Sequence, residues 1–262
     1  MAHDPATDTA MLVEAAQAAG EIALKYWKTD VTQYEKADGA GPVTVADLEI
    51  NEMLADRFGA SRPDYGWLSE ESDNNTERLD SERVFIIDPI DGTRAFIAGD
   101  KGFSVALAIA ERGIVKSAAI HLPARGETFA ATEGMGTTNN GEPVSVTNAD
   151  DLARATILAA RVQMQPDRWP GGVPPLDRHF RSSLAWRLSL VAEGRFDCMA
   201  TFRRSWEWDI AAGALIAAEA GTTVTDGEGQ PLRFNNPEPM TEGVVAAPNG
   251  LHPKIMAHRK PE

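Results

Sequence analysis

Apolar residues recur at helical spacing in two segments near the N-terminus. The first segment predicts an amphipathic helix over residues 11–28, with an apolar face formed by Met11, Leu12, Ala15, Ala16, Ala19, Ile22, Ala23, Tyr26 and Trp27. The second pattern predicts a helix that begins at Thr44. The residues on its inner side are Ile50, Met53, Leu54 and Phe58. Gly59 and Pro63 predict where this second helix ends. Residues 72–82 are polar and predict a mobile segment between regular elements.

Runs of β-branched and aromatic residues predict strands in the middle of the chain. Residues 84–87, Val-Phe-Ile-Ile, indicate a buried strand. Residues 103–110, 114–120 and 127–131 follow as successive strands, with a tight turn at 111–113. A glycine-rich stretch over residues 134–141 indicates the boundary between two halves of the chain.

Helical and strand patterns alternate in the second half. We expect helices over residues 182–193, 209–220 and 253–258, and strands over residues 156–160, 196–200, 223–225 and 244–247. The whole pattern predicts an α+β domain over residues 1–140 and an α/β domain over residues 141–262. The two domains are expected to pack closely as layers of one functional unit.

Composition and charge narrow the class of protein. The 262 residues are 43% hydrophobic and 24% charged, which is ordinary for a soluble globular chain. No apolar run approaches the roughly 18 residues of a membrane span, and the first residues lack a signal-peptide pattern. The single cysteine, Cys198, excludes an internal disulfide, so we expect a cytoplasmic protein. The net charge of −14 argues against a nonspecific grip on a nucleic acid polymer.

Two carboxylates follow the strand at residues 84–87. Residues 88–93 are Asp-Pro-Ile-Asp-Gly-Thr, in which Pro89 stiffens the backbone and Gly92 favours a tight turn. Carboxylates held this close repel each other unless a cation lies between them. A short helix over residues 94–98 would direct its N-terminus toward an anion. The alternative is a plain turn, because Asp-Pro and Asp-Gly each mark turns when they occur alone.

Further acidic residues elsewhere in the chain would complete such a site. They are Asp47, the pair Glu70-Glu71, and Asp209, which follows Trp208. Each also has a structural interpretation: Asp47 would close a capping box with Thr44, the glutamates would be a solvated pair, and Asp209 would meet a helix dipole. Oxygen ligands without nearby cysteine or histidine favour Mg²⁺ over Zn²⁺.

The order of these motifs resembles the signature of the inositol monophosphatase superfamily. The motifs that show this resemblance are Asp47, Glu70-Glu71, the hexapeptide at 88–93, and Trp208-Asp209 with Gly213 one turn later. Members of this superfamily are magnesium-dependent and often lithium-sensitive phosphatases. The resemblance implies a five-layer αβαβα sandwich, a homodimer, and a small phosphorylated metabolite as substrate.

The resemblance also implies roles for individual residues. Two or three Mg²⁺ ions are expected, and the ligands of the first two would be Glu70, Asp88 and the Ile90 carbonyl, and then Asp88, Asp91 and Asp209. Asp47, Glu70 and Thr93 would orient or deprotonate the attacking water. Asp91 and the backbone amides of Gly92 and Thr93 would hold the phosphate. Glu71 and Lys36 are candidates for supporting positions around these groups.

The choice of substrate depends on a basic segment before Trp208-Asp209. Arg203, Arg204 and Glu207 are predicted to contact the substrate, because paired arginines bind a second phosphate or a carboxylate better than a neutral polyol. Ser182-Ser183-Leu184 and Glu207-Trp208-Asp209 are similar to the bacterial 3′(2′),5′-bisphosphate nucleotidase branch. That branch usually has a lysine after the serine pair, where this chain has Ala185-Trp186-Arg187.

Several functions therefore stay open from the sequence. A bisphosphate nucleotidase and an inositol-1-phosphatase are the leading hypotheses, and a histidinol-phosphatase is the third. A protein that keeps the fold and binds a phosphorylated ligand or a macromolecular partner without catalysis is the alternative. The arginine pair could also be solvated without contacting any ligand.

Overall fold

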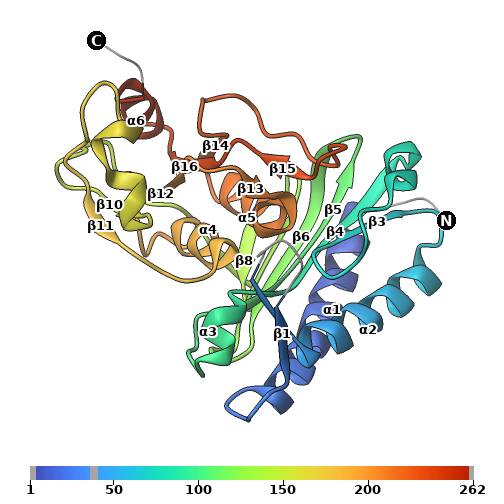
Figure 1. Cartoon of the computed structure of the whole chain (residues 1–262). Coiled ribbons are helices and arrows are strands. Elements are labelled where there is room, and N and C mark those ends of the chain that lie inside the picture. Colours follow the sequence, from blue (N-terminus) through green and yellow to red (C-terminus); the bar gives the residue numbers. More distant parts are fainter. Residues whose placement is uncertain (1–3, 36–40, 260–262) are drawn as a thin grey trace.

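A seven-stranded sheet forms the centre of the molecule. The structure, a computed structural model, describes residues 4–35 and 41–259 (Figure 1). Along the sheet the strands are β3 (Gly66–Ser69), β4 (Arg83–Asp91), β5 (Ser104–Glu111), β6 (Ile114–Leu122), β7 (Glu127–Thr132), β8 (Thr137–Asn139) and β9 (Glu142–Val144). β3 and β4 are parallel and the other neighbours are antiparallel. The strands predicted at residues 84–87, 103–110, 114–120 and 127–131 are confirmed.

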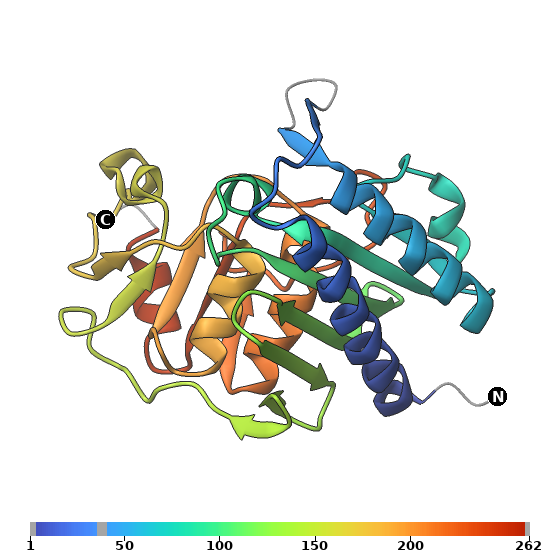
Figure 2. The same ribbon diagram turned by 90° about the horizontal axis from the view of Figure 1, so that it is seen from below.

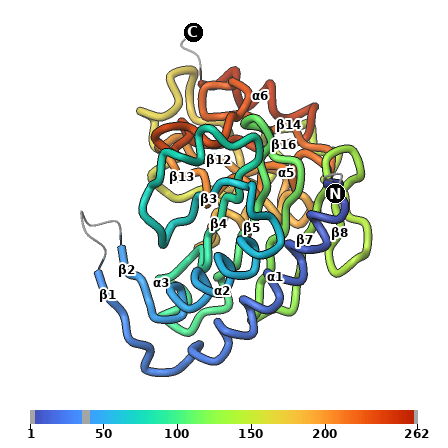
Figure 3. The backbone as a smooth tube through the Cα atoms, turned by 90° about the vertical axis from the view of Figure 1, so that its right-hand side faces the viewer, coloured from blue at the N-terminus to red at the C-terminus, as the bar shows by residue number. Residues whose placement is uncertain are grey.

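Two N-terminal helices cover one face of this sheet. α1 (Pro5–Tyr26) and α2 (Val45–Ser61) lie side by side in Figure 3, and both predicted helices are confirmed. Their apolar faces pack on alternate residues of the strands, among them Phe85 and Ile87 of β4. The opposite alternation, with Val84 and Ile86, faces the other side of the sheet. β4 is therefore buried on both faces, as its unbroken apolar sequence requires.

Two further helices separate the large sheet from a second one. α4 (Leu184–Ala192) and α5 (Glu207–Glu219) lie between the sheets, as Figure 2 shows. The second sheet has five strands in the order β11 (Asp177–His179), β10 (Thr156–Leu158), β12 (Cys198–Thr201), β16 (Val244–Pro248) and β14 (Thr222–Thr225). α6 (His252–Ala257) packs on its far face through Ile255. The predicted αβαβα sandwich is thus confirmed.

The two halves of the chain share one apolar core. The cluster around α4 and α5 takes residues from β3–β7 and also from β12 and β16, which lie on either side of residue 140. The division into domains 1–140 and 141–262 stays a prediction. Within the described residues, no helix is both long enough and apolar enough for a membrane span.

Short elements differ most from the sequence predictions. Unpredicted two-stranded pairings join β1 (Gln33–Glu35) to β2 (Pro42–Thr44), and β13 (Ser205–Trp206) to β15 (Met240–Thr241). Two 3-10 helices, over Arg161–Met164 and Pro166–Arg168, were also not predicted. The segment 72–82, predicted to be mobile, contains the 3-10 helix η2 (Thr76–Asp80), whose Arg78 is buried. That prediction was wrong because the polar side chains of this segment find partners inside the protein.

Candidate metal and phosphate site

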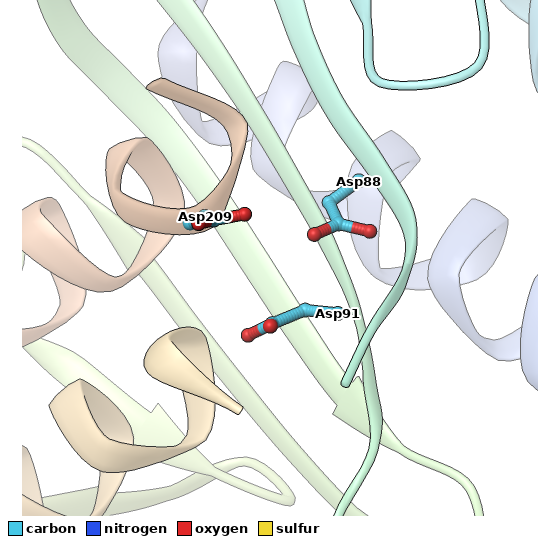
Figure 4. A group of neighbouring side chains, drawn as sticks. All are labelled: Asp88, Asp91 and Asp209. Atoms are coloured by element: carbon cyan, nitrogen blue, oxygen red, sulfur yellow. The ribbon is translucent and has the colours of Figure 1, made fainter. Parts of the chain in front are cut away.

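Three aspartates from distant parts of the chain meet between the large sheet and α5. Figure 4 shows Asp88 and Asp91 extending from β4 and Asp209 extending from α5, with their carboxylates directed toward a shared space. One carboxylate oxygen from each residue lies within 4.8 Å of the others. The sequence prediction that these acids converge is therefore realised in the fold.

The end of β4 explains how two of these carboxylates reach the same space. Asp88 continues the alternation of Val84 and Ile86, which face α4 and α5. The register of β4 against β5 shifts between Asp88 and Asp91, so the strand is irregular at this point. Gly92 follows with a φ of 93°, and a Cβ there would lie 2.9 Å from the Gly102 carbonyl oxygen. Only glycine fits this turn, from which α3 (Thr93–Ile97) starts, one residue earlier than predicted.

The N-terminus of α4 holds Asp91 in place. Ser183, the N-cap of α4, donates its hydroxyl to Asp91 Oδ2 at 2.5 Å, and the Ala185 N–H donates to the same oxygen at 2.7 Å. Burial raises the pKa of Asp91 to about 6, and these two hydrogen bonds oppose that rise. Ser183 thus has a positioning role that the Ser-Ser resemblance alone did not define.

The carboxylate of Asp88 lies in an environment that disfavours its negative charge. Its side chain is 1% exposed, and among the described residues neither carboxylate oxygen accepts a hydrogen bond from an N–H or hydroxyl group. Burial raises the pKa of Asp88 well above its ordinary value, and the nearby charges of Glu70, Asp91 and Asp209 raise it further. A buried carboxylate without donors is costly unless a cation is bound. The all-oxygen donor set fits a hard divalent cation such as Mg²⁺.

The remaining predicted ligands border the same cavity. Its volume is about 390 Å³, and its lining includes Glu70, Ile90, Gly92 and Thr93 together with the three aspartates. Glu70 follows β3, whose Ser69 pairs with Ile87, so Glu70 lies beside Asp88. The Thr93 hydroxyl donates to the Ile90 carbonyl oxygen at 3.1 Å. The fold therefore brings the predicted metal and phosphate residues of β3, β4 and α3 to one cavity.

Asp47 has the structural role that its sequence position allowed. It is buried near the start of α2, where its Oδ2 accepts hydrogen bonds from the Thr44 N–H at 2.8 Å and the Thr44 hydroxyl at 2.5 Å. Its own N–H completes the capping box with Thr44. Asp47 and Glu71 do not line the cavity formed by the described residues, and Lys36 lies outside those residues. A role for Asp47 in orienting water stays a prediction.

Two arginines bring positive charge to the cavity wall. Arg187 of α4 is 5% exposed, and its Nε donates to the Arg181 carbonyl oxygen at 2.6 Å. Burial lowers the pKa of Arg187 to about 10, which still leaves it protonated at neutral pH. Arg203 lines the same cavity, as does Phe180, whose ring lies 4.6 Å from the Arg187 guanidinium carbon. In the sequence, Arg187 follows the serine pair where the nucleotidase branch usually has a lysine, so it is the residue that would substitute for that lysine.

Arg204 and Glu207, two predicted substrate contacts, do not line the cavity as the described residues form it. Arg204 is exposed and forms ion pairs with Glu238 at 2.8 Å and Glu242 at 3.1 Å. Glu207 is fully buried, and its carboxylate accepts hydrogen bonds from the backbone N–H groups of Asn235 at 2.6 Å and Asn236 at 2.9 Å. Substrate contacts of Arg204 and Glu207 stay predictions, and in the fold both side chains are engaged with other parts of the protein.

Comparisons with known proteins agree with this geometry. The Inositol monophosphatase family matches residues 4–262. The chain is 34% identical to a fructose-1,6-bisphosphatase/inositol-1-monophosphatase of Thermotoga maritima, covering 80% of this chain and 81% of the relative. It is 31% identical to the 3′(2′),5′-bisphosphate nucleotidase CysQ of Aggregatibacter actinomycetemcomitans, covering 87% of each. The solved structure of a Thermotoga maritima IMPase superposes with a TM-score of 0.82 at 28% identity, over 94% of each chain. The protein therefore belongs to the inositol monophosphatase family, whose enzymes hydrolyse phosphate monoesters.

Proposed function

We propose that this protein is a Mg²⁺-dependent phosphomonoesterase that acts on a small phosphorylated metabolite. The observation that carries the proposal is the buried carboxylate of Asp88, which faces two further aspartates and accepts no N–H or hydroxyl hydrogen bond from the described part of the chain. A site built this way favours a bound cation over an empty space. The family to which the chain belongs supports the reaction class.

The cavity residues would have three roles in hydrolysis: binding the ions, activating the water and binding the phosphate. Glu70, Asp88, Asp91, Asp209 and the Ile90 carbonyl would hold the ions. Bound Mg²⁺ supplies positive charge that offsets the phosphate and makes water more acidic.

Thr93 and Glu70 would act on the attacking water. The Thr93 hydroxyl donates a hydrogen bond to the Ile90 carbonyl oxygen. The Thr93 Oγ1 lone pairs would then accept a hydrogen bond from the water and orient it. The Glu70 carboxylate would receive the proton that this water loses. The amides of Gly92 and Thr93 would contact the phosphate at the mouth of the turn.

The cavity wall favours a substrate with a second anionic group. Arg187 and Arg203 both line the cavity that holds the acidic residues, and a guanidinium pairs well with phosphate oxygens. The CysQ relative carries a name that specifies a bisphosphate nucleotide. We therefore place 3′-phosphoadenosine 5′-phosphate first among candidate substrates.

An inositol phosphate is the second candidate, because the Thermotoga relative is named for inositol-1-monophosphatase and fructose-1,6-bisphosphatase activities. Histidinol phosphate is the third candidate.

A direct assay of phosphate release tests the proposal. The panel is 3′-phosphoadenosine 5′-phosphate, inositol-1-phosphate and histidinol phosphate, each measured with Mg²⁺ and with a chelator. We expect turnover only with Mg²⁺, and a loss of about 1,000-fold in kcat/KM for Asp88→Asn, since the charge that holds the cation contributes several kcal/mol.

The matched control is Asp56→Asn, the same change on an exposed aspartate of α2, which should keep wild-type activity. Turnover that survives the chelator, or wild-type turnover in Asp88→Asn, would refute the assignment. Mg²⁺ binding without hydrolysis of any ester in the panel would favour a phospholigand-binding protein instead.

The sequence also predicts a homodimer, a cytoplasmic location and inhibition by lithium. These properties stay predictions that accompany the proposed function.

A further inference from the structure

A buried arginine packs against β3, the strand that precedes Glu70. Arg78 of η2 is 2% exposed. Its Nη2 donates to Asn74 Oδ1 at 2.9 Å and to the Asn236 carbonyl oxygen at 2.8 Å, and its Nη1 donates to Asn235 Oδ1. The Asn235 amide donates back to the Arg78 carbonyl oxygen at 3.2 Å. The planar guanidinium thus joins the 74–78 segment to residues 235–236.

Arg78 is also packed tightly on the strand that leads to Glu70. A Cβ built on Gly66 of β3 would lie 3.0 Å from the Arg78 Cβ and 3.1 Å from its Cα. The absence of a side chain at Gly66 lets η2 lie directly on β3. β3 runs from this contact at Gly66 to Ser69, the residue before Glu70, so the strand connects Arg78 to the segment that carries Glu70.

Glu207 fastens the other side of the same asparagine pair. It is the first residue of α5, two positions before Asp209. Besides the two backbone N–H groups of Asn235 and Asn236, its Oε1 accepts a hydrogen bond from the Asn236 side-chain amide at 2.7 Å. The opposite charges of Arg78 and Glu207 attract each other across this pair.

We propose that Arg78, Asn235, Asn236 and Glu207 form a clamp that sets the spacing between Glu70 and Asp209. The clamp residues are positioning residues, since none of the four lines the cavity of the described structure. This inference rests on the metal site of the proposed function. Mg²⁺ accepts only near-ideal octahedral geometry, so small displacements between ligand-bearing segments weaken its binding.

The test compares Mg²⁺ binding in clamp variants with that in a matched structural variant. Arg78→Lys keeps the charge and removes the planar fork. Asn235→Gly removes the side-chain amide while tolerating the residue's φ of 62°. The control is Arg62→Lys, because Arg62 also bridges separate elements, donating to Asp8 at 2.7 Å and 3.0 Å, but lies outside the site.

Two readouts separate a positioning role from a stabilising one. The Kd of Mg²⁺ is measured by calorimetry without substrate, and the half-saturating Mg²⁺ concentration is measured during phosphate release. We expect both to rise roughly tenfold in Arg78→Lys and Asn235→Gly, the range seen when groups that orient metal ligands are removed. Arg62→Lys should lower Tm and leave both values unchanged.

The outcomes distinguish this inference from the proposed function. Wild-type Mg²⁺ affinity in both folded clamp variants, or failure of both to fold, would overturn the clamp and leave the hydrolase assignment standing. A wild-type protein that binds Mg²⁺ and hydrolyses nothing would overturn only the hydrolase assignment. A wild-type protein that does not bind Mg²⁺ would overturn both.

Discussion

At the scale of single residues, position decides what identical side chains do. Arg203 and Arg204 are adjacent, yet Arg203 lines the cavity while Arg204 is paired with Glu238 and Glu242. The sequence presents them as one basic pair. In the fold they separate into a candidate anion contact and a surface ion pair.

This separation predicts different kinetic effects for the two arginines. Arg203→Ala should raise the KM for 3′-phosphoadenosine 5′-phosphate about tenfold or more, since a hydrogen bond to a charged group contributes about 1.5–3 kcal/mol. The KM for inositol-1-phosphate, which lacks a second phosphate, should change little. Arg204→Ala should change neither value. Equal effects of Arg203→Ala on both substrates would contradict a second anion site.

The chemistry of the site was predictable where the residue type itself limits the options. Asp88 and Asp91 are separated only by Pro89-Ile90, and Gly-Thr follows Asp91. Two carboxylates this close repel each other unless a cation lies between them. Glu207 offered no such limit, because a glutamate at the first position of a helix can face a ligand or a loop. Its partners, Asn235 and Asn236, are distant in sequence and became visible only in the fold.

At the scale of elements, α4 and α5 pack unusually closely at Gly213. A Cβ at this position would lie 2.5 Å from Leu188 Cδ1 and 2.7 Å from Leu188 Cβ. Rotation of the leucine can relieve only the first of these contacts. Gly213 therefore sets the distance between the helix that bears Asp209 and the helix that holds Asp91.

Gly213→Ala should consequently destabilise the protein by about 1–3 kcal/mol, because overpacking outweighs the roughly 1 kcal/mol gained in helix propensity. Denaturant unfolding measures this change. Leu188→Ala in the same chain opens space, so the double variant should lose less stability than the sum of the two single variants. An unchanged or raised stability in Gly213→Ala would show that α5 is free to shift.

Element length determined how well the sequence predicted the fold. α1, α2, α5 and β4–β7 are long enough for the spacing of their apolar residues to indicate a helix or a strand, and all were predicted. β13 contains only Ser205 and Trp206, and it exists because β15 pairs with it. η2 likewise owes its order to Arg78 contacts with residues 235–236. Such elements are made by distant partners, which a local pattern does not contain.

At the scale of the whole molecule, the layered architecture concentrates acidic charge inside a chain that is already acidic. The site lies between the large sheet and the α4–α5 layer, so three aspartates converge in a protein of net charge −14. Without a cation, this arrangement opposes folding through both desolvation and repulsion. The fold and its expected ion are therefore energetically linked.

This linkage predicts that Mg²⁺ and Asp88→Asn each raise the thermal stability of the metal-free protein, and that the two effects do not add. At a Mg²⁺ concentration of about 100 Kd, wild-type protein should gain about 2.7 kcal/mol, which corresponds to a rise in Tm of about 5–10 °C. Without Mg²⁺, Asp88→Asn should melt a few degrees above wild type, because the amide removes a buried charge at nearly constant volume. With Mg²⁺, the variant should gain much less than wild type.

Differential scanning calorimetry measures all four conditions, with NaCl at matched ionic strength as the control for general screening of the acidic surface. A Tm rise with NaCl equal to the rise with Mg²⁺ would mean that screening, not a site, stabilises the protein. A metal-free Asp88→Asn that melts well below wild type would mean that Asp88 supports the fold through contacts of its own. Only a specific gain with Mg²⁺ that disappears in the variant agrees with a carboxylate that has no N–H or hydroxyl donor among residues 4–35 and 41–259 and therefore needs a cation as its partner.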